Sequence, residues 1–451
     1  MEPMRRMLED DFQVWAQGGD NRPILIQGAR RVGKTFLVEE CGRRLFGNGF
    51  VKVDFQTDLE RASAVFDGPT DDIDGITARI AEYKRTSLDP ATSLILLDEV
   101  QLCEKALNSL RFFAASPWRV AATGSLLGVT VKQRKLPFPS DVKHVRMHPM
   151  TFEEFLWAMG EEAMPDAIRE HARTCEPYVL HDRAWGLYER YLVVGGMPKA
   201  VRAYRDTRSF EAVREVHEEI DITYTADMTD PDNGISAAAA KRIWESLPKQ
   251  LLRASTKKFK YSEVVRGGRR AQLLEPLEWL EAAGIVLRND LTCDTTAPLA
   301  AFNDDEGSFF KEYVCDTGLM FHKFGIEAEL FLDPKLKPLL SSDFRGALAE
   351  NSVMQALHAN GIKTFYWMPV EKVGQGEVDF VFQDRLARIV PVEVKSSRNV
   401  KAKSFTHLVR AGRTDVAYLL SENDFASSVH RETGCKVAQL PLYSAFCINA
   451  G

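Results

Sequence analysis

The feature that most constrains this chain is the stretch from Gly28 to Thr35, which matches the phosphate-binding loop pattern G-x-x-x-x-G-K-[ST] at every fixed position. The apolar run 23–27 predicts a buried strand before it, and residues 35–41 predict a helix after it. A glycine-rich turn between a strand and a helix directs backbone N–H groups and the helix N-terminus at phosphate oxygens. The predicted nucleotide site consists of Gly28, Ala29, Arg30, Arg31, Val32, Gly33, Lys34, Thr35 and Phe36. Lys34 would bind phosphate and Thr35 a Mg²⁺ ion.

A second apolar run, residues 93–97, ends in the two carboxylates Asp98 and Glu99. Asp98 would complete the Mg²⁺ shell, and Glu99 would act as the catalytic group that activates the attacking water. Alone, the same residues are compatible with a solvated turn. A third predicted strand, 118–125, brings small hydroxyls to its end, so Ser125 or Thr123 would contact the γ-phosphate unless this is a plain Gly-Ser turn.

Composition sets the class of protein. With 451 residues, the chain has room for two to four domains, and its charged and hydrophobic fractions (27% and 45%) are those of an ordinary globular protein. The net charge of −6 argues against a general polyanion-coating role but allows a local basic patch. The N-terminus lacks a signal-peptide core, no run of 18 apolar residues occurs, and the seven cysteines show no C-x-x-C spacing. We therefore expect a cytoplasmic protein with reduced cysteines.

The order of elements predicts an α/β fold. Residues 1–150 alternate strands and helices, as in a parallel sheet covered on both faces, and form the expected P-loop core. Thr151, with Glu154 three residues later, predicts a capping box that opens a helical region over 151–234. Gly195-Gly196-Met197-Pro198 interrupts that region, and the turn cluster 231–234 marks its end.

Residues 235–322 read as three helices followed by strands, which is the order of a winged-helix domain. Six cations cluster around its middle: Lys257, Lys258, Lys260, Arg266, Arg269 and Arg270. Such a cluster can neutralise DNA phosphates, which makes DNA the expected partner. Winged helices also serve as protein contacts, and a run of charges can be only a solvated face.

The last segment, 323–451, carries a second set of charged residues on two predicted strands. Asp379 lies on the first, and Glu393 and Lys395 share one face of the second. This spacing is that of a PD-(D/E)xK nuclease metal site, to which Glu350 of a predicted helix would add a carboxylate. The expected activity is Mg²⁺- or Mn²⁺-dependent nicking of DNA. The alternatives are a nuclease-like fold that binds without cutting and a surface hairpin with ordinary charges.

Seven stretches together give the chain its resemblance to a known family: Gly28 to Thr35, Asp98-Glu99-Val-Gln101, Thr123-Gly124-Ser125, Pro149 to Phe155, Gly195-Gly196-Met197-Pro198, Asp316 to Leu319 and Glu393-Val-Lys395-Ser. The chain resembles the large prokaryotic family of AAA+ ATPases that join a P-loop module to a C-terminal domain of unknown function with a restriction-endonuclease-like core. The resemblance implies a P-loop core with an additional strand, a helical lid, a winged helix and a nuclease-like domain. It also implies that Pro198 packs near the adenine.

One departure from the family concerns the arginine finger. Relatives often read Gly-Arg before the last strand of the sheet, whereas this chain has Lys135-Leu-Pro-Phe-Pro139. Arg134 and Arg119 are the candidates within the chain, and a finger supplied by a neighbouring subunit would require an oligomer, with a hexameric ring favoured by analogy.

The sequence as a whole predicts an ATPase that uses ATP and Mg²⁺ and whose C-terminal domains engage DNA. Two other classes stay open. One is a slow nucleotide switch of the STAND type that recruits a protein, and the other is an ATPase that remodels polypeptides.

Overall fold

The computed structural model describes residues 3–125, 139–231, 234–252, 258–302, 309–370, 377–397, 403–412 and 414–450. The chain divides into two compact units. The first is Met1–His148 with the short pieces Met228–Ile235 and Ala282–Gly284, and the second comprises the remaining residues from Pro149 onward. Within the described residues, no helix is both long and apolar enough to cross a membrane.

A five-stranded sheet, parallel in all its pairings, forms the centre of the first unit. Its strands are β1 (Ile24–Gln27), β2 (Phe50–Asp54), β3 (Leu94–Asp98), β4 (Arg119–Gly124) and β5 (Lys143–Arg146), in the order β2-β3-β4-β1-β5. The predicted α/β core with a parallel sheet is therefore confirmed. Because β4 lies between β1 and β3, the loops that follow these three strands meet at one edge of the sheet.

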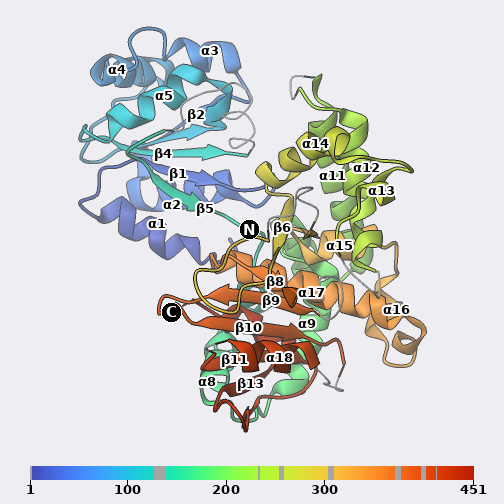
Figure 1. Ribbon diagram of the computed structural model, residues 1–451. Helices are drawn as coiled ribbons and strands as arrows, with labels where there is room; N and C mark the ends of the chain where they lie inside the picture. Colours follow the sequence, from blue (N-terminus) through green and yellow to red (C-terminus); the bar gives the residue numbers. More distant parts are fainter. Residues whose placement is uncertain are drawn as a thin grey trace. The chain divides into compact units, whose positions relative to one another are not determined.

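Helices cover both faces of this sheet (Figure 1). One face carries α3 (Leu59–Ala64), α4 (Ile73–Lys84) and α5 (Glu104–Phe113), whose apolar side chains share a core with β2, β3 and β4. Helices α1 (Leu8–Gln17) and α2 (Lys34–Phe46) lie on the other face. The buried core fixes the strand ends on which the site is built.

The second unit begins with a run of helices. Thr151 and Glu154 form the predicted capping box at the start of α7, with Thr151 N donating to Glu154 Oε2 at 2.9 Å. The helices before the second sheet are α7 (Phe152–Ala158), α8 (Met164–Thr174), α9 (His181–Val194), α10 (Pro198–Thr207), α11 (Phe210–Thr229), α12 (Ala237–Leu251), α13 (Tyr261–Val264) and α14 (Arg270–Ala282). Further along the chain are α15 (Thr317–Lys323), α16 (Ala328–Leu332), α17 (Ser342–Ala359) and α18 (Lys403–Ala411).

An eight-stranded mixed sheet completes the second unit. Its strands are β6 (Val286–Thr292), β7 (Phe310–Val314), β8 (Phe365–Trp367), β9 (Val378–Gln383), β10 (Ile389–Val394), β11 (Val416–Ser421), β12 (Ala426–Val429) and β13 (Lys436–Pro441), in the order β12-β13-β11-β10-β9-β8-β6-β7. The three helices expected for a winged helix are α12, α13 and α14. The strands expected to follow them, β6 and β7, do not form a separate wing, because β6 pairs with β8 of the C-terminal segment.

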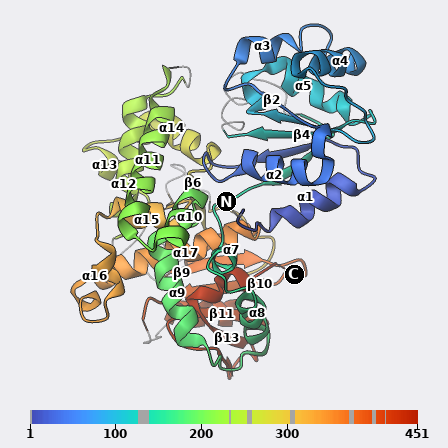
Figure 2. The same cartoon turned by 180° about the vertical axis from the view of Figure 1, so that it is seen from behind.

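Two helices cover opposite faces of this sheet. Figure 1 looks onto the face covered by α18, and Figure 2 looks from behind, where α17 and α9 lie. The outermost strand β7 is closed by α17: Asn351 accepts from Val314 N at 2.9 Å and donates to Val314 O at 3.0 Å. These two side-chain bonds satisfy backbone groups that an edge strand would otherwise leave open.

Candidate nucleotide-binding site

The loop between β1 and α2 has the backbone of a phosphate cradle. Arg31 (φ 72°) and Gly33 (φ 97°) both lie in the left-handed region, and α2 begins directly afterwards at Lys34. A Cβ on Gly28 would overlap the carbonyl oxygen of Met147, so only glycine allows this approach. The first-turn N–H groups of α2 are left for an anion, as a helix N-terminus provides.

Arg6 fixes the loop from outside, and its role was missed from the sequence. Its guanidinium donates to Val32 O at 2.8 Å and to His148 O at 2.8 Å. The bond to Val32 spans 26 residues, and no local pattern around Arg6 indicates it.

Lys34 is buried and folds back on the loop. Its Nζ donates to Gly28 O at 3.0 Å and Ala29 O at 2.9 Å. Burial lowers the pKa of Lys34 to about 8, although the carboxylates of Glu99 and Asp98 act in the opposite direction. The two carbonyl oxygens are neutral acceptors for the Lys34 ammonium. A phosphate bound in the loop would give this ammonium an anionic partner, which forms a stronger hydrogen bond.

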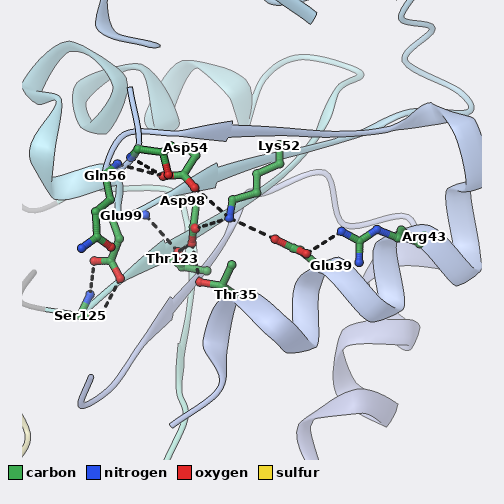
Figure 3. A network of polar contacts seen from close by, with 11 residues as sticks. Thr35, Glu39, Arg43, Lys52, Asp54, Gln56, Asp98, Glu99, Thr123 and Ser125 are labelled. Carbon is green, nitrogen blue, oxygen red and sulfur yellow. Dashed lines mark hydrogen bonds and ion pairs between the residues drawn. The ribbon is translucent and has the colours of Figure 1, made fainter. Parts of the chain in front are cut away.

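Asp98 at the end of β3 contacts both α2 and β4 (Figure 3). Its Oδ1 accepts from Thr35 Oγ1 at 2.6 Å and from Thr123 Oγ1 at 2.5 Å. Thr35 and Asp98, the two predicted Mg²⁺ ligands, are therefore in direct contact. A metal bound between them would take its remaining ligands from phosphates and water, as Mg²⁺ usually does in proteins.

Lys52 of β2 adds a cation that was not anticipated. Its Nζ lies 2.8 Å from Asp98 Oδ2, 3.1 Å from Glu39 Oε1 and 3.1 Å from Asp54 Oδ2 (Figure 3). Burial would lower the pKa of Lys52, but these carboxylates outweigh burial and hold the pKa above its usual value. The alternating burial of β2, with Lys52 and Asp54 on one face, was the available signal.

Because Lys52 neutralises the carboxylate that a metal needs, Lys52→Met is expected to strengthen Mg²⁺ binding at the nucleotide site. A partly exposed ion pair contributes about 1 kcal/mol, so the half-saturating Mg²⁺ concentration in ATP binding should fall about fivefold. Lys105→Met removes an equal charge from an exposed pair with Asp67 in the same unit and should have no effect. A rise in the Mg²⁺ requirement of Lys52→Met would instead mean that Lys52 positions Asp98 for the metal.

Glu99 is held by polar partners at the end of β4. Ser125 Oγ donates to Glu99 Oε1 at 2.6 Å, and Ser125 N and Gln101 Nε2 donate to Oε2 at 3.1 Å and 2.6 Å. Burial would raise the pKa of Glu99, but the charge of Lys34 and these hydrogen bonds outweigh it and lower the pKa. Glu99 is therefore an ionised carboxylate at neutral pH. Ser125 contacts Glu99, and Thr123 contacts Asp98.

Four further residues were predicted for the nucleotide site or its arginine finger: Arg119, Arg134, Phe36 and Pro198. Arg119 is the first residue of β4, and its guanidinium donates to the carbonyls of Trp15 and Gly18. Its role as an arginine finger stays a prediction. Arg134 lies outside the described residues. Phe36 is half exposed on α2, and Pro198 is the first residue of α10 in the second unit. Its contact with adenine stays a prediction.

The charged residues predicted for a nuclease site gather on the second sheet. Lys395 Nζ lies 2.5 Å from Glu393 Oε1, and Asp379 Oδ2 accepts from Val394 N at 2.8 Å. Glu350 of α17 accepts from Lys311 of β7 at 3.0 Å. Across the part of the chain that the structure describes, no group of three or more His, Cys, Asp and Glu side chains is arranged to hold a metal ion.

The basic cluster is largely exposed. Lys260, Arg266, Arg269 and Arg270 are exposed on the segment from α13 to the start of α14, and none of them forms an ion pair with another described residue. Lys258 is half-buried over the Phe309 ring, 3.4 Å from its centroid. Lys257 lies outside the described residues.

The additional strand, the glycine-rich loop and the paired carboxylates define the first unit as a P-loop nucleotide-binding domain. Residues 20–156 match the family described as AAA domain. Residues 186–330 and 345–443 match two families, DUF8612 and DUF4143, that are described only as domains of unknown function. No curated protein matches the sequence.

Several solved structures show a distant likeness. Cdc6p from Pyrobaculum aerophilum is 13% identical, with 64% of this chain and 89% of that chain covered and a TM-score of 0.27. AMPPCP-bound DnaA from Aquifex aeolicus is 13% identical, with 60% and 86% covered and a TM-score of 0.27. PCH-2 from C. elegans is 17% identical, with 46% and 64% covered and a TM-score of 0.25. Such low TM-scores do not establish a common fold over the matched lengths.

Proposed function

We propose that this protein is a Mg²⁺-dependent ATPase. The observation that carries the proposal is the direct contact of Thr35 with Asp98, at 2.6 Å, beside the ionised Glu99 at the same strand edge. These are the groups that phosphoryl transfer to water requires: a cradle for the phosphates, a place for the metal and a base for the water.

Each residue has a defined task in this proposal. The loop 28–35 and Lys34 bind the phosphates, and Thr35 and Asp98 hold the metal. The metal would neutralise charge that develops on the transferred phosphoryl group. Glu99 accepts the proton of the attacking water, for which it must turn from Ser125 and Gln101.

The test is ATP hydrolysis by the full chain with Mg²⁺, measured without DNA and with single-stranded, duplex and branched DNA. Lys34→Ala should abolish nucleotide binding, because it removes the buried ammonium of the loop that would hold the phosphates. Stimulation by DNA supports an enzyme that acts on nucleic acid. Hydrolysis that DNA does not change favours the two alternatives, a nucleotide switch or a protein-remodelling ATPase.

DNA is the second element of the proposal, and the exposed cations of the segment 260–270 favour it. Their charges have no ion-pair partner in the described residues, so phosphate contact would cost little rearrangement. Bound phosphates would release counterions from the DNA, which makes affinity depend on salt.

We expect duplex affinity to fall steeply with salt concentration, and each cation removed should flatten the slope of log K against log salt by about one. Arg266→Ala and Arg269→Ala test the segment, and Lys241→Ala, an exposed residue of α12 paired with Glu245, is the control. Equal slopes for all three variants would place the DNA contact elsewhere.

Assembly is the third element. Arg119 donates to the carbonyls of Trp15 and Gly18, and a neighbouring subunit could supply the arginine finger, for which a hexameric ring is the favoured form. We expect light scattering with ATP and Mg²⁺ to show an oligomer and the specific activity to fall on dilution. A monomer that keeps full activity at high dilution would exclude this assembly.

A further inference from the structure

Lys311 is a lysine with a fully buried side chain at the acidic cluster of the second sheet. Its Nζ lies 3.0 Å from Glu350 Oε1 and 3.0 Å from Glu377 Oε1. Tyr313, two residues along β7, donates its hydroxyl to the same Glu350 oxygen at 2.5 Å. The period of a strand places Lys311 and Tyr313 on one face, where both meet Glu350 of α17.

The surroundings keep this lysine charged. A buried ammonium costs several kcal/mol unless carboxylates and hydrogen bonds compensate for the lost hydration. Burial lowers the pKa of Lys311, but Glu350 and Glu377 outweigh burial and hold it well above the usual value. The Tyr366 ring, 5.1 Å from Nζ, adds a cation–π contact.

The predicted metal ligands are engaged in the same way. Asp379 accepts from Val394 N and lies close enough to Lys311 and Lys395 to raise the pKa of both. Lys395 pairs with Glu393.

Glu393 Oε2 is buried without a hydrogen-bond partner among the described residues. The ammonium groups of Lys311 and Lys395 are paired with the carboxylates of Glu350, Glu377 and Glu393. These two cations offset much of the negative charge that would attract a divalent cation.

We propose that Lys311 is the resident cation of this acidic cluster. Its ammonium pairs with Glu350, one of the predicted metal ligands, and with Glu377, and the native cluster therefore takes neither Mg²⁺ nor Mn²⁺. The cluster is an internal ion-pair centre that ties β7, α17 and the start of β9 together, and the segment contributes binding rather than metal-dependent cleavage.

The test is Mn²⁺ binding to the full chain without nucleotide, in an Asp98→Asn background that removes the P-loop ligand. The parent should show no Mn²⁺ site by electron paramagnetic resonance. Lys311→Met should gain one, bound at least about tenfold more tightly than by the parent, because two carboxylates lose their cation. Adding Glu350→Gln should abolish the gain. Lys323→Met is the matched control, since the Lys323 side chain is largely buried in the same unit and its one ion-pair partner among the described residues is Asp221.

Two results would overturn the proposal. One is a Mn²⁺ site in the parent that is lost in Glu393→Gln. The other is Mg²⁺- or Mn²⁺-dependent nicking of DNA by the native protein that is lost in Asp379→Ala. These two measurements do not require Lys311→Met to fold. ATP hydrolysis by the native chain is measured in parallel. It tests the proposed ATPase activity independently of metal binding at the Lys311 cluster.

Discussion

Replacing Glu99 by Gln is expected to leave ATP binding intact and to reduce the hydrolysis rate about 10²–10⁴-fold, the usual contribution of a general base. Gln retains an oxygen that can accept from Ser125 and has the shape of Glu, so the loop and β3 should keep their structure. Only the proton acceptor is lost. ATP binding by calorimetry and single-turnover hydrolysis separate the two effects.

Glu104→Gln is the matched control for Glu99→Gln. Glu104 is exposed at the start of α5, five positions along the chain, and the substitution removes the same charge. It should hydrolyse ATP at the native rate. If Glu99→Gln also turns over at the native rate, another group activates the water and the role of Glu99 is wrong.

The nucleotide site could be predicted well because its parts are local. The pattern from Gly28 to Thr35 fixes a strand, a turn and a helix within a short stretch, and Asp98 and Glu99 end an unmistakably apolar strand. Parallel strands align their carboxyl ends at one edge of the sheet. The strand order alone therefore brings the phosphate-binding loop and the two carboxylates together. The sequence could not assign a partner to each hydroxyl at the end of β4, where Thr123 bonds Asp98 and Ser125 bonds Glu99.

The residues that sequence reasoning missed act over long distances in the chain. Arg6 reaches His148, and Lys311 reaches Glu350 and Glu377. A lysine inside a predicted strand reads as solvent-facing, and only the tertiary fold shows that its carboxylate partners surround it. The sequence did not indicate that β6 would also pair with β8, because that pairing depends on a segment more than seventy residues away.

Three of the stretches that carry the family resemblance meet in the second unit. Gly196 N donates to Asp316 Oδ2 at 2.6 Å, and Met150 N donates to Gly196 O at 2.6 Å. A Cβ on Gly195 would overlap Asp316 Oδ1 and the backbone of Gly318. The glycine pair was expected to belong to a lid near the adenine. Within the second unit its glycines allow three backbone segments to touch.

Gly196→Ala is therefore expected to destabilise the second unit by about 3–5 kcal/mol. The added Cβ would overlap the backbone N and O of Met150, which cannot move aside as the end of a flexible side chain can. Relief would break the bonds to Met150 and Asp316, and each buried polar group left unpaired costs about 1–3 kcal/mol. Denaturant unfolding followed by intrinsic tryptophan fluorescence, to which Trp185 in α9 contributes, measures the loss.

The control for Gly196→Ala is the same substitution at Gly186, ten positions earlier in the chain. Gly186 lies inside α9, and its Cβ would approach only the end of the Arg190 side chain, at 3.3 Å. Alanine is favoured over glycine in a helix interior by about 0.8–1.0 kcal/mol, so Gly186→Ala should stabilise the unit. The two substitutions would then change the free energy of unfolding in opposite directions. This would show that glycine is needed at position 196 because the backbones approach closely there, and not because glycine is flexible. A neutral Gly196→Ala would contradict the close backbone contact described between Gly196 and Met150.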